Sequence, residues 1–161
     1  MDREILFRGK DKETGKWIYG NLIHREDESP VPETSETYSV DYISDCSLNS
    51  TEREVDSNTI GQYTGMIDKN KNKIFEGDIL KHILSDGTIV YFIIKWCTIS
   101  RKLMPIKGFI YDDNEVQLNG WTFIWKKFAL YPSIIDNIPD NERMEIVGNI
   151  YDNPELVENE K

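Results

Sequence analysis

The chain has 161 residues, of which 39% are hydrophobic and 11% aromatic, and a formal net charge of −10. This length fits one ordinary domain or a small domain with an appendage, and the apolar content is enough to bury a core, which excludes wholesale disorder. No apolar run approaches the length of a membrane-spanning helix and no signal-peptide pattern begins the chain, so we expect neither.

The acidic charge is concentrated in two segments. Residues 26–56 carry a net charge of −9 and residues 136–161 a net charge of −6, whereas the rest of the chain is mildly basic. This pattern indicates a solvated acidic linker and tail rather than an anionic surface that imitates nucleic acid. Cys46 and Cys97 are isolated from each other in sequence, as expected of free thiols in a reducing cytosol.

The N-terminal part of the chain predicts two segments. Residues 1–25 predict a β-hairpin module, because two β-forming runs flank a short polar loop that contains Gly15. Residues 26–58 are rich in Ser, Thr, Glu, Asp and Pro, and predict an acidic linker. Within it, residues 38–43 are compatible with one short edge strand.

Residues 59–161 have a dense β pattern. We expect strands near residues 73–84, 87–97, 105–111, 120–131 and 143–151, a hairpin turn at Asp86-Gly87, and one helical turn after Asn153-Pro154. The predicted fold class is mostly β, either all-β or a β-rich α+β arrangement. The N-terminal hairpin module would precede a small, SH3-like or partly open β-barrel domain formed by residues 59–161.

Two segments of the chain share an order of residue types. Residues 11–23 and 68–80 each contain a charged loop that begins with Asp, a Lys, two apolar residues, a Gly, an Asn or Asp, and two further apolar residues. Because Gly permits a bulge or corner that a Cβ atom resists, each segment predicts a strand that bends at the glycine and continues. We interpret the pair as one reused supersecondary device, with chance resemblance as the alternative.

The known sequence motifs of catalysis and metal binding are incomplete or absent in this sequence. Asp68, Asn70 and Asn72 alternate as in a calcium loop, but the required Gly and Glu are replaced by Lys73 and Ile79, so the loop is a connection. His24, His82 and the two cysteines lack the paired spacing of a zinc site. The sequence has neither a nucleophile elbow nor a phosphate loop. We therefore predict no enzyme, no catalytic or metal-ligating residues and no cofactor.

An aromatic and basic cluster is the candidate interaction surface. Its members are Lys95, Trp96, Trp121, Trp125, Lys126, Lys127 and Tyr131. Aromatic rings beside cations can bind single-stranded nucleic acid by stacking and charge, and exposed aromatics equally serve a protein interface. Alternation also places Trp121 and Trp125 on the face of Phe123, which is the pattern of a core.

Three blocks carry a family resemblance: EILFRGKDKETGKWIYG at residues 4–20, VDSNTIGQYTGMIDKNKNKIFEGDILK at residues 55–81, and EIVGNIYDNPEL at residues 145–156. In this order they resemble the YopX-like family of phage and prophage proteins. The chain departs from the family at Lys10, where an aromatic is usual, and at Lys71 and Asn72, where a loop glycine is usual. The missing glycine implies a different turn geometry.

The resemblance implies a small, mostly β protein of a phage or prophage that acts in the cytoplasm of the bacterial host. It brings no established activity. Our first hypothesis is a non-enzymatic interaction protein that binds a host or phage protein and can also form a homo-oligomer, without a membrane partner. The alternative is single-stranded or general nucleic-acid binding through the basic and aromatic surface of the C-terminal domain.

Overall fold

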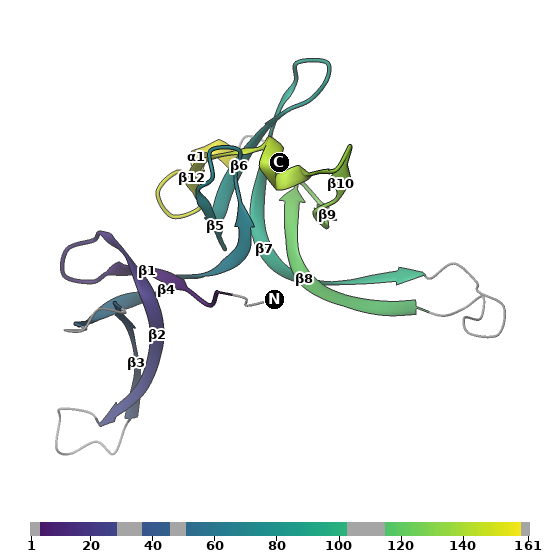
Figure 1. The fold of residues 1–161 in the computed structure, drawn as a ribbon. Helices are drawn as coiled ribbons and strands as arrows, with labels where there is room; N and C mark the ends of the chain where they lie inside the picture. Colours follow the sequence, from purple (N-terminus) through teal and green to yellow (C-terminus); the bar gives the residue numbers. More distant parts are fainter. Residues whose placement is uncertain (1–3, 29–36, 46–50, 103–114, 159–161) are drawn as a thin grey trace. The chain divides into compact units, whose positions relative to one another are not determined.

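The structure is a computed structural model that describes residues 4–28, 37–45, 51–102 and 115–158. Strands dominate these residues, and the helical segments among them are single turns, η1 (Asp140–Arg143) and α1 (Glu155–Glu158). The predicted mostly β fold is confirmed (Figure 1). The chain divides into two compact units, which are residues 1–66 with 73–76 and residues 67–72 with 77–161.

The strand pairings of the first unit close into a ring. Its strands are β1 (Phe7–Asp11), β2 (Trp17–Glu28), β3 (Thr37–Ser44), β4 (Glu52–Ile67) and β5 (Lys73–Phe75). β1 pairs with β2, β2 with β3, β3 with β4, and β4 returns to β1, all antiparallel. β5 lies beside β4. The hairpin expected in residues 1–25 therefore forms, as one part of a larger sheet.

β3 lies in the segment that the sequence interprets as an acidic linker. The expected strand at residues 38–43 is present, but it is not an edge strand, because it pairs with β2 along its length and with β4 through residues 42–44. Val40 and Ile43 are 6% and 1% exposed, so the strand buries apolar side chains although the segment around it is acidic. Most of the described part of residues 26–58 thus belongs to the sheet of the first unit.

The core of the first unit combines aliphatic side chains with an aromatic cluster. Ile43, Val55 and Ile74 are at most 1% exposed. The Phe75 ring contacts the Tyr63 ring at a centroid distance of 5.6 Å. The buried guanidinium of Arg8 lies 5.1 Å from the Phe75 ring centroid and donates to the Glu76 carbonyl oxygen at 3.0 Å. A buried cation is tolerated here because rings and a carbonyl group replace its water.

The second unit is an open antiparallel sheet with the order β12-β6-β7-β8-β9. Its strands are β6 (Asp78–Ile83), β7 (Ile89–Lys102), β8 (Glu115–Trp125), β9 (Phe128–Leu130) and β12 (Glu145–Asn149). A small separate hairpin joins β10 (Ile134–Ile135) to β11 (Ile138–Pro139). The predicted turn at Asp86-Gly87 connects β6 to β7, and Gly87 has a φ of 85°.

The sequence prediction differs from this unit in two respects. The barrel was expected in residues 59–161, whereas the closed ring of pairings lies in the first unit, and no pairing joins β9 to β12 among the described residues. The strand expected near 73–84 is split into β5 and β6 at Gly77, whose φ of 81° makes the predicted bend. The strand expected at residues 105–111 lies outside the described residues.

Candidate functional site

An apolar groove lies on one face of the second unit's sheet. Alternate residues of β7 point to opposite faces. On one face Val90, Phe92 and Ile94 are at most 7% exposed. On the other face Ile93 is only partly buried, and it borders a cavity of about 760 Å³. The apolar side chains that line this apolar groove are Ile93, Ile124, Phe128, Ile150, Pro154 and Val157.

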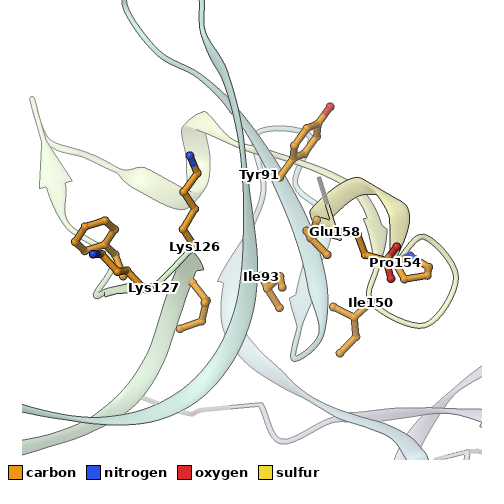
Figure 2. A pocket seen from close by; sticks show the side chains of 10 residues that line it. Tyr91, Ile93, Lys126, Lys127, Ile150, Pro154 and Glu158 are labelled. Atoms are coloured by element: carbon orange, nitrogen blue, oxygen red, sulfur yellow. The ribbon is translucent and has the colours of Figure 1, made fainter. Parts of the chain in front are cut away.

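The rim of the apolar groove is charged. Lys126 and Lys127 border one side and Glu158 the other, with Ile93 between them (Figure 2). Lys126 occupies the turn between β8 and β9 with a φ of 52°, and its Nζ lies 5.2 Å from the Trp125 ring centroid. Nζ of Lys127 lies 5.8 Å from the Phe128 ring centroid. Two cations thus stand beside an apolar floor, as a site for an acidic and apolar ligand requires.

The opposite wall of the apolar groove is built by the residues between β12 and α1. The Asn149 side chain accepts the backbone N–H groups of Tyr151 and Asp152, each at 3.0 Å, and its amide donates to the Asp152 carboxylate at 2.8 Å. Gly148 leaves room for Asn153, because a Cβ atom there would lie 2.2 Å from Asn153 Oδ1. The register of β12 against β6 shifts at this glycine. These contacts fix where Pro154 and α1 stand.

The predicted interaction surface is divided between different places. Trp96 and Trp121 are direct cross-strand neighbours on β7 and β8, with ring centroids 5.0 Å apart, and Trp96 is 46% exposed. Lys95 is exposed but, as the neighbour of Trp96 along the strand, points to the opposite face of the sheet. Tyr131 donates its hydroxyl to the Leu118 carbonyl oxygen, and its ring lies against Gly120.

The other three predicted residues gather at the turn between β8 and β9. The Trp125 ring stacks on that of Phe128 at a centroid distance of 6.1 Å, next to Lys126 and Lys127. Only the two lysines of the predicted set line the apolar groove. The structure therefore brings together Trp96 with Trp121, and Trp125 with both lysines, but it does not join all seven residues into one surface.

The comparisons with known proteins identify the family. Residues 6–158 match the family model described as YopX protein. This chain belongs to the YopX family. The crystal structure of protein EF1440 from Enterococcus faecalis is similar over 98% of this chain and 100% of that chain, with 21% sequence identity and a TM-score of 0.46. The comparison with curated proteins gave no match. Among the described residues, no helix is long and apolar enough to cross a membrane.

The central family block holds a buried carboxylate with a structural use. Asp68 is 0% exposed and accepts the backbone N–H groups of Asn70 and Asn72, each at 2.8 Å, and that of Ile146 at 3.2 Å. Burial raises the pKa of Asp68, but the hydrogen bonds from Asn72, Ile146 and Asn70 outweigh it, so the pKa lies below the ordinary 3.8. The carboxylate thus binds amide donors of its own chain.

The shared turn of the two repeated segments is visible in the structure. The Asp11 carboxylate accepts the N–H groups of Glu13 and Thr14, and the Asp11 N–H donates to the Lys16 carbonyl oxygen at 2.9 Å. The equivalent bond of Asp68 reaches Asn72, so the second turn is one residue shorter. Lys71 has a φ of 67°, close to the 68° of Gly15, so a lysine occupies a backbone conformation that glycine favours.

The part of the chain that the structure describes contains no cluster of three or more His, Cys, Asp or Glu side chains that could hold a metal ion.

Sequence reasoning missed Ile124, Ile150 and Val157, which line the apolar groove. Ile150 and Val157 belong to or follow the closing family block, so that block was the signal that could have indicated them.

Proposed function

We propose that this YopX-family chain is a non-enzymatic interaction protein of a phage or prophage that binds a host or phage protein in the bacterial cytoplasm. The observation that supports the proposal is the apolar groove of the second unit. Its floor of Ile93, Ile124 and Val157 can bury apolar side chains, and its two rim lysines can pair with acidic ones. A protein segment with both features fits this chemistry.

The test is site-specific photo-crosslinking in host cells. A photoreactive phenylalanine analogue at Phe128, which is 49% exposed at the apolar groove, is expected to give covalent protein adducts that survive nuclease treatment. The same analogue at Ile83, which is 58% exposed on β6 and is not part of the groove lining, is the matched control and is expected to give none of these adducts. Equal adducts from both positions, or no adduct at Phe128, would contradict the proposal.

Nucleic-acid binding is the second candidate, and the β7–β8 ribbon is the feature that favours it. Trp96 is 46% exposed, and of the cations on β7 Lys102 shares its face by alternation, whereas Lys95 and Arg101 point to the opposite face. Stacking on an exposed ring with cations nearby is how sequence-tolerant proteins hold single strands. We expect quenching of tryptophan fluorescence by single-stranded DNA at low salt, lost in Trp96→Ala and weakened steeply as salt rises. Absence of quenching at low salt would eliminate this candidate.

A further inference from the structure

A small hairpin of the second unit presents isoleucines to solvent. The hairpin comprises residues 134–139, in which β10 pairs with β11. Ile134 is 72% exposed, Ile135 is 50% exposed and Ile138 is 44% exposed. A scattered exposed isoleucine needs no explanation, but three within five residues form an apolar knob that a monomer gains nothing by exposing. We call residues 134–139 the isoleucine knob.

The isoleucine knob is held in one conformation. Asp136 and Asn137 have φ values of 53° and 60°, which is the left-handed pair that a two-residue type I′ hairpin turn requires. At its base, Ser133 N–H donates to the Asp140 carboxylate at 3.0 Å, and beside the turn Arg143 donates to the Ile135 carbonyl oxygen at 2.6 Å. A preformed knob loses little conformational entropy when it docks, which favours a role in binding.

The isoleucine knob and the apolar groove have matching chemistry. The knob combines aliphatic side chains with the carboxylate of Asp136, which is 86% exposed at the turn and lies 3.7 Å from the Arg143 guanidinium. At this exposure the carboxylate can still meet a second cation. The groove combines an aliphatic and aromatic floor with Lys126 and Lys127 on its rim. A volume of about 760 Å³ is ample for two or three aliphatic side chains. The groove is not filled by its own knob, whose isoleucines remain exposed and are not part of the groove lining.

We propose that the partner in the apolar groove is a second copy of this chain, whose isoleucine knob inserts there with Asp136 facing Lys126 and Lys127. The inference rests on the proposed function and specifies its partner. Knob and groove are different surfaces of one unit, so the contact is heterologous: each copy donates one knob and receives another. Such contacts close into rings or continue as chains, according to the rotation between neighbouring copies.

The test is sedimentation velocity over a wide range of concentrations of the full chain. The unaltered chain is expected to associate as concentration rises. Ile134→Glu places a charge in the apolar contact and is expected to weaken association about tenfold or more. Ile83→Glu, at an isoleucine outside the knob that is 58% exposed against 72% for Ile134, is the matched control and is expected to associate as the unaltered chain does. Both positions are exposed, so circular dichroism should show the same fold for each variant.

Mixing two defective chains tests the head-to-tail geometry. Ile134→Glu keeps its groove, and the double variant Lys126→Glu, Lys127→Glu keeps its knob. At a concentration where the unaltered chain has just associated, each variant alone is expected to be mostly monomeric, whereas the mixture is expected to form one-to-one pairs and nothing larger. Asp136→Lys alone is expected to weaken association. In a single chain that also carries Lys126→Glu and Lys127→Glu it is expected to restore association, because the knob is then positive and the rim of the groove negative. Lysine already occupies left-handed backbone at Lys71 and Lys126, so the turn tolerates it.

The outcomes separate this inference from the proposed function. A chain that is monomeric at every concentration, equal association of Ile134→Glu and Ile83→Glu, or a mixture that stays monomeric would overturn the self-docking inference. In any of these cases, a crosslinked adduct at Phe128 with a different protein would leave the proposed function standing. An adduct at Phe128 with the mass of two copies of this chain is the result that both proposals expect.

Discussion

Gly20→Ala is expected to lower the free energy of unfolding by about 3 kcal/mol or more, because a backbone atom occupies the space that the new methyl group needs. A Cβ atom at Gly20 would lie 2.0 Å from the Ser44 carbonyl oxygen and 3.1 Å from the Ile43 side chain. Relief would require β2 and β3 to separate where Asn21 pairs with Ser44. Urea unfolding followed by circular dichroism measures the loss.

Gly15→Ala is the matched control for this substitution. It makes the same chemical change in the hairpin that contains Gly20, but a Cβ atom at Gly15 has nothing within 4 Å. Its cost is limited to the left-handed backbone, with φ at 68°, and is expected to be about 1 kcal/mol. Equal losses for the two variants would show that the close approach of Ser44 to Gly20 does not control stability.

The sequence predicted the local elements of this fold better than their assembly. The hairpin turn at Gly87 and the bend at Gly77 follow from residues whose backbone requirement is local, and both glycines have positive φ. Gly20 was expected to make a similar bend. Instead, glycine is required there because the backbone of β3, from another part of the chain, approaches too closely for a Cβ atom. A sequence pattern indicates which backbone angles a glycine permits, and it does not show which atom will approach the missing Cβ.

The ring of pairings in the first unit was not predictable for the same reason. β1 pairs with β4 across about fifty residues, for example Phe7 with Gln62, and such long-range pairing leaves no local signal. The strand at β3 was expected, but the acidic composition of residues 26–58 favoured a linker and so placed it at an edge, whereas Val40 and Ile43 are buried. Composition reports the average of a segment, and it does not show which strands a short run within the segment will pair with.

The candidate site was predicted in part. The aromatic and basic run indicated Lys126 and Lys127, which do line the apolar groove. Alternation correctly placed Phe123 in the core, where it is 2% exposed, while Ile124 on the other face borders the groove. The single-turn α1 contributes Val157 and Glu158 to the lining of the groove. The position of so short a helix depends on tertiary packing. A single turn is too short to show a hydrophobic periodicity from which its packing face could be predicted.

Asp68→Ala is expected to lower the free energy of unfolding at neutral pH by about 3 kcal/mol or more. The substitution removes the acceptor of three backbone N–H groups, at Asn70, Asn72 and Ile146, and leaves them at a position where the side chain is 0% exposed. Unpaired buried donors are costly, and hydrogen bonds to a charged acceptor are stronger than neutral ones. Asp68→Asn keeps the shape and one acceptor oxygen, so its loss is expected to be smaller.

The pH dependence of this loss distinguishes the contribution of the charge of Asp68 from that of the shape of its side chain. The folded-state pKa of Asp68 is lowered, since hydrogen bonds from Asn72, Ile146 and Asn70 outweigh the opposing effect of burial. The unfolded chain therefore takes up the proton at a higher pH than the folded chain does. The stabilisation is fully present at pH values well above 3.8 and is lost as pH falls through the folded-state pKa.

The difference in free energy of unfolding between the unaltered chain and Asp68→Asn, measured by urea unfolding, is thus expected to be constant near neutrality and to shrink in acid. A difference that does not change down to the acid transition would mean that the charge of Asp68 contributes nothing. Asp11→Ala is the comparison, because the hydrogen bonds of Asp11 to Glu13 and Thr14 stay within its own turn and its ion pair, at 3.5 Å, is with the half-exposed Arg53, whereas Asp68 also holds the backbone of β12 through Ile146. Its loss is expected to be the smaller of the two.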